Sequence, residues 1–141
     1  MMKNNAVFDF SALRRAVSSL EEALTTYQQD TDNLFVRDAC IQRFEYTYEL
    51  AAKMLKRYLE YSEAVPEQVD HMAFPTLIRT ACEQGLLLNS WDQWSVYRSS
   101  RNLTSHTYNE TNALKVCDVM PLFLEEMAYL LAQLSSRLEA L

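Results

Sequence analysis

The chain has 141 residues, of which 49% are hydrophobic and 23% are charged, a composition typical of globular rather than disordered proteins. One glycine and three prolines are too few for the many tight turns of a strand-rich fold, so we predict an all-α fold. The net charge of −6 argues against a DNA-binding protein, although it leaves room for a local basic site. The length fits a single domain over residues 1–141.

Two long helices are predicted in the first half of the chain. The first runs from Asp9 or Ser11 to Gln29, because apolar residues recur there every three or four positions. Residues 30–33 are a cluster of cap- and turn-forming side chains, and the second helix is predicted over residues 34–61. The short connection predicts that the two helices form an antiparallel hairpin.

The middle of the chain predicts shorter elements. Residues 66–75, which lie between two prolines, are expected to form an irregular connection. A short helix is predicted over residues 76–84, with Gly85 as its C-terminal stop. Ser90 is expected to cap a further helix that begins at Trp91.

The last helix is expected to start after caps around Thr111 and Asn112 and to run to the C-terminus. Pro121 should kink or restart it, because proline lacks the N–H group that a helix interior needs. The predicted architecture is therefore an antiparallel bundle of about five helices.

The three cysteines, Cys40, Cys82 and Cys117, are far apart and have no CxxC spacing. We expect them to be reduced residues of the core, and we expect no metal site and no cofactor. The sequence has no apolar stretch long enough for a signal peptide or a membrane span. A cytoplasmic protein without a membrane partner is therefore expected.

The segment from Arg101 to Thr111 does not follow the helical pattern, because it is rich in Asn, Ser and Thr, which favour caps and turns. Arg101 and His106 are five residues apart and would point about 140° apart on an unbroken helix. Their side chains can converge only if the helix breaks between them. We therefore predict an interruption between Leu103 and Thr111.

An Arg and a His in one polar turn suit phosphate chemistry. Imidazole serves as a general acid or base near neutral pH, and guanidinium binds a phosphate through two hydrogen bonds. RNA cleavage through its own 2′-hydroxyl needs no more than such groups and no metal. A second interpretation stays open, in which His106 caps a helix and Arg101 pairs with an acidic neighbour.

Two stretches together resemble the HEPN superfamily: RFEYTYEL at residues 43–50, continued by KMLKRYL at 53–59, and RNLTSHTY at 101–108. Within that superfamily they resemble the nucleotidyltransferase substrate-binding-protein branch, whose toxin members are called HepT. The second stretch matches the family pattern of Arg, four residues, His, any residue and Tyr without a gap. The resemblance extends from about residue 9 to residue 138.

The resemblance implies a helical-bundle homodimer in which the Arg–His motifs of two subunits face one cleft. It implies a metal-independent ribonuclease toxin, with Arg101 binding phosphate, His106 as the acid–base group and Asn102 as an auxiliary polar contact. It also implies a minimal nucleotidyltransferase antitoxin as partner, which neutralises the toxin by complex formation and by transferring AMP to Tyr108. Alternatively, Tyr108 packs against the bundle with its hydroxyl group hydrogen-bonded.

Two other functions stay open. The chain could be a non-catalytic subunit that presents a substrate to the nucleotidyltransferase, or a plain dimeric scaffold.

Glu45 and Glu49, four residues apart on the second predicted helix, are interpreted first as part of a solvated charge ladder. The resemblance places this helix beside the motif, so that Glu49 could instead orient Arg101.

Overall fold

The regular secondary structure of the computed structural model, which describes residues 9–62 and 66–138, is entirely helical. A 3₁₀ turn, η2 (Thr104–His106), separates the last two of six α-helices. These are α1 (Ser11–Gln29), α2 (Leu34–Ser62), α3 (Pro66–Asp70), α4 (Phe74–Glu83), α5 (Trp91–Leu103) and α6 (Glu110–Leu138). The predicted all-α bundle is confirmed. Within the part of the chain that the structure describes, no helix has the length and apolar character needed to span a membrane.

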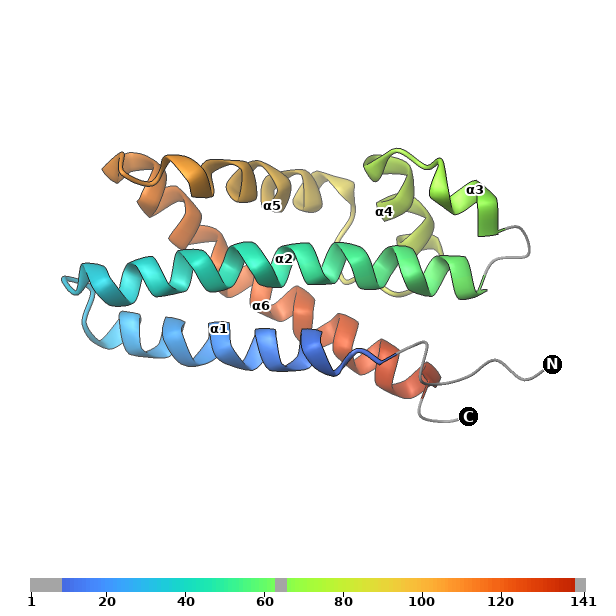
Figure 1. Cartoon of the computed structure of the whole chain (residues 1–141), viewed down its shortest axis with the longest axis horizontal. Coiled ribbons are helices and arrows are strands. Elements are labelled where there is room, and N and C mark those ends of the chain that lie inside the picture. The colour runs from blue at the N-terminus through green and yellow to red at the C-terminus, as the bar shows by residue number, and fades with distance from the viewer. Residues whose placement is uncertain (1–8, 63–65, 139–141) are drawn as a thin grey trace.

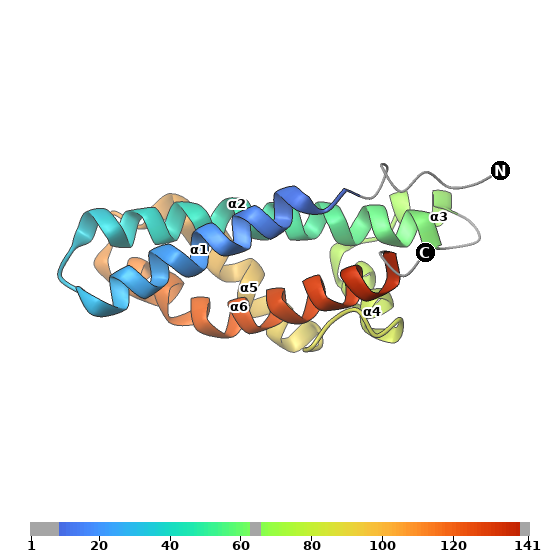
Figure 2. The ribbon, with the colours of Figure 1, turned by 90° about the horizontal axis from the view of Figure 1, so that it is seen from below.

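Four helices run along the long axis of the molecule, and α3 and α4 lie together at one end (Figures 1 and 2). The helix α1 is antiparallel to α2, and α5 is antiparallel to α6 (Figure 1). The connections α1–α2 and α5–α6 both lie at the end opposite α3 and α4 (Figure 1). This topology brings the polar segment after α5 close to the start of α2.

An aromatic cluster at the centre of the bundle fixes α5 and α6 against α2. Phe44, Trp94, Tyr97 and Phe123 are fully buried. The ring of Phe123 makes edge-to-face contacts with Phe44 at 4.9 Å and with Tyr97 at 5.3 Å between centroids. Aromatic pairs bury a large apolar area and prefer the edge-to-face geometry, so they determine how α5 packs against α2 and α6.

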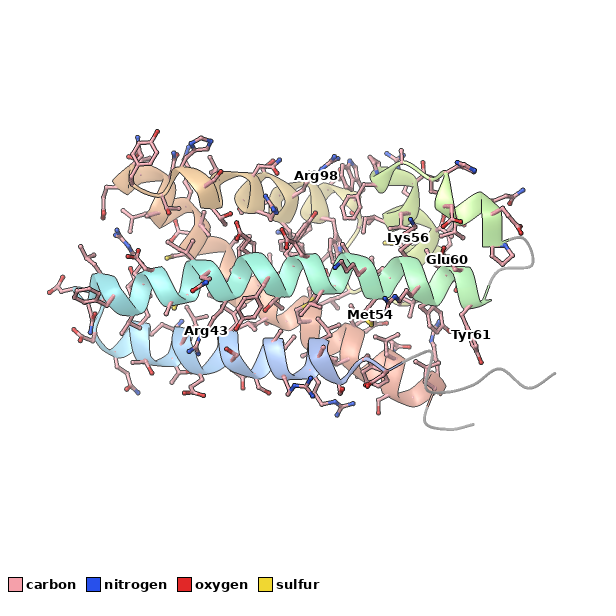
Figure 3. The ribbon with its side chains drawn as sticks, in the orientation of Figure 1. Arg43, Met54, Lys56, Glu60, Tyr61 and Arg98 are labelled. Carbon is pink, nitrogen blue, oxygen red and sulfur yellow. The ribbon has the colours of Figure 1, made fainter. Side chains whose placement is uncertain are left out.

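The predicted hairpin of α1 and α2 is confirmed, with helix boundaries that agree to within one or two residues. Asn33 caps α2, because its Oδ1 accepts a hydrogen bond of 3.2 Å from the backbone N–H of Val36. Arg43 lies between α2 and α1 (Figure 3), where its Nη1 donates a 2.7 Å hydrogen bond to the carbonyl of Ser19. The Tyr46 hydroxyl lies 2.8 Å from Ser19 Oγ.

The prediction of an irregular connection over residues 66–75 is wrong, because most of these residues are helical. The helix α3 begins at Pro66, and Pro75 lies in the first turn of α4, which begins at Phe74 rather than at residue 76. Proline is suited to a first helical turn, because the N–H group it lacks would have no helical partner there. The prolines therefore start helices here instead of excluding them.

The predicted stop at Gly85 is confirmed. Gly85 has a φ of 76°, in the left-handed region that glycine adopts readily. The N–H of Gly85 donates to the carbonyl of Cys82 at 2.9 Å, and the N–H of Leu86 donates to that of Ala81 at 3.0 Å. These two bonds form a Schellman motif that closes the end of α4.

The predicted start of α6 is wrong, and of the two outcomes predicted at Pro121, a kink or a restart, the restart does not occur. The cap of α6 is Asn109, whose Oδ1 accepts a 3.2 Å hydrogen bond from the N–H of Asn112, so the helix starts at Glu110 and not after Thr111 and Asn112. The helix also continues through Pro121 and does not restart there. Met120 and Phe123 on either side of the proline are fully buried, and their packing holds the helix together across it.

The three cysteines are free: Cys40 and Cys117 are buried and Cys82 is half-buried, as expected. One buried carboxylate was not foreseen. Glu126 is fully buried and accepts hydrogen bonds from the N–H of Leu88 at 2.6 Å and from Asn89 Nδ2 at 3.0 Å. Burial raises the pKa of this carboxyl group above its usual value. Glu126 thereby ties the connection before α5 to α6.

An ion pair joins the start of α2 to the start of α6. Arg37 is buried, with 7% of its surface exposed, and its Nη1 lies 2.7 Å and 2.6 Å from the two carboxylate oxygens of Glu110. The arginine holds the pKa of the Glu110 carboxyl group below its usual value. Arg37 falls on the apolar stripe of α2, three residues after Leu34 and four before Ile41, a position that would have predicted its burial.

We predict that Glu110→Gln lowers the melting temperature by several degrees at neutral pH, because it leaves the buried Arg37 charge without a counter-charge. The pKa of Glu110 is lowered from 4.5 in the folded chain, so the pair's stabilisation is present above pH 4.5 and lost as the pH falls through the folded pKa. Thermal unfolding followed by circular dichroism should therefore show the parent and the variant converging at acidic pH.

The matched control is Asp70→Asn, which removes the partner of Lys56 in an exposed pair with 3.7 Å between Lys56 Nζ and Asp70 Oδ1. Lys56 projects from α2 (Figure 3), and exposed pairs of this kind contribute little to stability. Equal effects of the two substitutions at neutral pH would contradict the structural role of the Arg37–Glu110 pair.

Candidate functional site

The polar segment after α5 breaks the helix, as predicted. The helix α5 ends at Leu103, η2 covers Thr104–His106, and a turn at residues 107–108 leads to α6. No residue of the described chain other than Gly85 has a positive φ, so this break is built without backbone strain. The interruption lies between Leu103 and Glu110, inside the predicted interval.

Side chains of the segment itself stabilise the break. The Thr104 hydroxyl lies 2.7 Å from the carbonyl of Arg101, and the Thr107 hydroxyl donates a 3.3 Å hydrogen bond to the carbonyl of Thr104. Asn112 Nδ2 donates to the carbonyl of His106 at 3.2 Å. These side chains bond carbonyl groups that the ends of a broken helix leave without helical partners.

Glu45 and Glu49 of α2 hold the end of α5. Arg101 Nη2 forms an ion pair with Glu49 Oε1, and the Thr104 hydroxyl donates to Glu45 Oε2. The hydrogen bond to Glu49 raises the pKa of Arg101 above its usual value. The interpretation of Glu45 and Glu49 as members of a solvated charge ladder is therefore wrong, because both carboxylates reach across to the motif. The expected contact between Glu49 and Arg101 is observed.

The other motif side chains face solvent. His106 and Asn102 are exposed, and Tyr108 has 89% of its surface exposed. The rings of His106 and Tyr108 contact each other edge to face, with 6.2 Å between centroids. The alternative that Tyr108 packs against the bundle is therefore wrong for this chain.

The break alone does not join the side chains of Arg101 and His106 through a hydrogen bond. Within residues 9–62 and 66–138, no hydrogen bond or ion pair joins their side chains, and the side chain of Asn102 has no hydrogen-bond partner. Arg101 is held toward α2 by Glu49, whereas the side chain of His106 is exposed. In one chain the site therefore consists of a fixed, half-exposed guanidinium and a separate, freely accessible imidazole.

Neither of the two interpretations left open for the motif describes the site fully. Arg101 does pair with an acidic residue, but Glu49 comes from another helix and is 52 positions away. His106 contributes only its backbone carbonyl to the helix ends, so its ring is not a cap. Among the residues whose placement is described, no group of three or more His, Cys, Asp and Glu is arranged to hold a metal ion.

A groove runs between the first half of α2 and the motif turn, with a volume of about 460 Å³. From the motif side it is lined by Thr104, Thr107 and Tyr108. Sequence reasoning missed this groove, because the residues that α2 contributes to it are separated from the motif by more than 50 positions. The arrangement offers an always-charged anion-binding group, an accessible acid–base group and an exposed phenol within one end of the bundle.

Comparison with known proteins assigns the chain to a family. The model of the family described as nucleotidyltransferase substrate binding protein like matches residues 8–136. A protein of Haemophilus influenzae (strain ATCC 51907 / DSM 11121 / KW20 / Rd) named probable ribonuclease HepT is 38% identical over 97 residues. The match covers 69% of this chain and 66% of that relative, just under two thirds of its length.

Two solved structures are similar to the chain in fold and in sequence. A Haemophilus influenzae protein, described as having the fold of a substrate binding domain of a nucleotidyltransferase, is similar with a TM-score of 0.83 and 31% identity, over 89% of this chain and 98% of that one. A Thermus thermophilus protein is similar with a TM-score of 0.70 and 32% identity, over 86% of this chain and 98% of that one. The chain belongs to the nucleotidyltransferase substrate-binding-protein-like family, the HepT-type branch of the HEPN superfamily.

Proposed function

We propose that this chain is a HEPN-type toxin, a metal-independent ribonuclease that acts in the cytoplasm and is neutralised by a cognate minimal nucleotidyltransferase. The observation that carries the proposal is the exposed turn after α5, which presents His106 and Tyr108 to solvent a few residues after Arg101, whose guanidinium is fixed by Glu49. Similarity to a protein named probable ribonuclease HepT supports the same reaction class.

In this proposal Arg101 binds the scissile phosphate. A guanidinium has five N–H donors, and Glu49 engages the Nη2 end, so further N–H groups remain for phosphate oxygens. Glu49 fixes the orientation of the side chain in advance, and the positive charge stabilises the additional negative charge of the transition state. Asn102, exposed next to Arg101 in sequence, serves as an auxiliary polar contact.

His106 acts as the acid–base group. It removes the proton of the 2′-hydroxyl, the 2′-oxygen attacks the adjacent phosphorus, and the bond from phosphorus to the 5′-oxygen breaks. The leaving 5′-oxygen takes up a proton, which leaves a 2′,3′-cyclic phosphate on one product and a 5′-hydroxyl on the other. This reaction consumes no water and needs no metal.

A homodimer would complete this chemistry, because one imidazole accepts a proton while the other donates one. Each chain carries one motif histidine, and among the described residues no hydrogen bond or ion pair joins it to Arg101. The second motif of a dimer would supply the missing group from across a shared cleft. Exposed apolar side chains on α5 and α6, among them Val96, Leu114 and Leu122, support association with another surface.

The partner nucleotidyltransferase would silence the toxin by binding it and by transferring AMP to Tyr108. The phenol is free to accept a nucleotidyl group, because 89% of the residue is exposed. The transfer joins the phenol oxygen to the α-phosphorus of ATP and releases pyrophosphate. The attached phosphodiester is negative and would compete with RNA phosphate for Arg101.

The second candidate is a non-catalytic subunit that presents a substrate to the nucleotidyltransferase. The acidic side chains that line the groove, Asp38 and Glu45, favour it, because they repel RNA phosphates. The name of the family to which the chain belongs, and the chain's similarity to a nucleotidyltransferase substrate-binding fold, also fit this role.

We predict that the chain, expressed without its partner, slows growth and degrades RNA in the presence of EDTA. His106→Ala and Arg101→Ala should each reduce cleavage by about 100-fold or more while the circular dichroism spectrum stays unchanged, because neither side chain is part of the core. The controls are His71→Ala and Arg79→Ala, exposed residues of the same types outside the motif, which should cleave as the parent does.

Cleavage at the parent rate by His106→Ala would contradict the catalytic assignment. A parent chain that never cleaves RNA, alone or as a purified protein, would favour the accessory subunit instead.

We predict that co-expression with the cognate nucleotidyltransferase adds AMP to Tyr108, detectable by intact-mass and peptide mass spectrometry. Tyr108→Phe should remain unmodified and stay toxic at equal partner levels. Tyr46→Phe, which alters a tyrosine that is already hydrogen-bonded to Ser19, should be modified and neutralised as the parent is. Full neutralisation of Tyr108→Phe would mean that complex formation alone is enough.

We predict a homodimer in sedimentation velocity experiments at micromolar concentration, because the proposed reaction needs a second motif. A monomer under these conditions that still cleaves RNA would contradict the shared-cleft proposal.

A further inference from the structure

The groove beside the motif contains groups that the proposed reaction does not use. On the α2 side it is lined by Leu34, Arg37, Asp38, Ile41, Gln42 and Glu45, and on the motif side by Thr104, Thr107 and Tyr108. Its volume of about 460 Å³ lies within the range of small-molecule sites, about 300–1,000 Å³. A single nucleoside is therefore of the right size to enter it.

The apolar part of the lining suits the flat face of a base. Leu34 and Tyr108 are both more than half exposed, so neither is held in the core, and Ile41 next to them belongs to the buried stripe of α2. Aromatic side chains are common platforms on which unpaired bases stack. Exposure of Tyr108 leaves one face of its ring free for such a contact.

The polar part of the lining suits the edge of a base. Asp38 and Gln42 are one helical turn apart on α2, so their side chains share a face. Among residues 9–62 and 66–138, Asp38 has no hydrogen-bond or ion-pair partner, and the neighbouring Arg37 is already bound to Glu110. An ionised carboxylate only accepts hydrogen bonds, so it favours a base with an exocyclic amino group and disfavours one that presents carbonyl oxygens.

We propose that this groove binds one nucleobase that carries an exocyclic amino group, with its face on Tyr108 and its amino group donating to Asp38. Asp38 and Glu45 in the lining repel phosphate, and the charge of Arg37 is balanced by its pair with Glu110, so the phosphate of the nucleotide points away from the groove, toward Arg101. The source of the base rests on the proposed function: it is either a nucleotide next to the scissile bond of RNA or the adenine of an AMP group attached to Tyr108. The binding chemistry is the same for both.

The test is a titration of the ¹⁵N-labelled full chain with adenosine, cytidine and uridine, followed by backbone amide signals. Adenosine and cytidine should shift signals of residues 34–42 and 104–108, and uridine should bind on the order of 10-fold more weakly. Asp38→Asn should remove most of this preference, because an amide donates as well as accepts. Asp118→Asn, an exposed carboxylate of α6 that lines another groove, should leave the preference intact.

Equal affinity for uridine, shifts confined to other parts of the chain, or an unchanged preference in Asp38→Asn would overturn the proposal. These outcomes are independent of cleavage, because nucleosides have no scissile phosphate and bind whether or not the chain is a ribonuclease. Loss of cleavage with intact adenosine binding would therefore count against the proposed function and not against the groove.

Protein modified by the nucleotidyltransferase separates the two sources of the base. If the attached adenine occupies the groove, the amide signals of residues 34–42 are already shifted and added adenosine changes them no further. If the groove still binds free adenosine with the parent affinity, the base that it receives belongs to RNA.

Discussion

Glu45 and Glu49 lie one turn apart on α2 and hold the end of α5 through the hydroxyl of Thr104 and the guanidinium of Arg101. The candidate site depends on this contact, because it fixes where the helix ends and where Arg101 points. A charged partner makes such a hydrogen bond stronger than a neutral one. The turn that follows is thereby anchored at its start, and Asn109 and the Arg37–Glu110 pair anchor it at its end. Between these anchors His106 and Tyr108 face solvent.

The ion pair between Arg101 and Glu49 also bears on how an acidic protein is compatible with the proposed phosphate chemistry. With a net charge of −6, the chain lacks the broad positive surface of nonspecific nucleic-acid-binding proteins. A single arginine held in place by Glu49 presents a local positive charge without that surface. In the proposed site, the carboxylates of Asp38 and Glu45 would repel phosphate from the adjoining groove and leave it to the guanidinium. This division of charge at one end of the bundle fits a site for one phosphate and one base.

Much of the fold was predictable from the sequence, because local patterns determine it. The apolar stripes predicted α1 and α2, the Asn, Ser and Thr content predicted the break after α5, and Gly85 predicted the end of α4. The errors in helix boundaries arose at residue types that occur in more than one kind of local structure. Pro66 and Pro75 start helices instead of interrupting them, and Asn109 caps α6 ahead of Thr111 and Asn112.

The site was predictable only in part, because its residues come together through tertiary packing. The motif identified Arg101, His106 and Tyr108, but nothing local indicates that Glu45 meets Thr104 across 59 positions or that Arg37 meets Glu110 across 73. The buried charges Arg37 and Glu126 interrupt apolar stripes, and this is the one sequence signal that marks them in advance. The motif also does not indicate that Arg101 is bound to Glu49 while the side chain of His106 is exposed.

The most direct measurement of the central claim is the chemistry of the RNA ends. Purified chain is incubated with a short RNA of defined sequence in EDTA, and the products are identified by mass spectrometry. A 2′,3′-cyclic phosphate on the upstream product and a 5′-hydroxyl on the downstream product are expected, because the attacking oxygen belongs to the RNA itself. A 5′-phosphate on the downstream product, or cleavage that requires an added divalent metal, would contradict a mechanism built on Arg101 and His106.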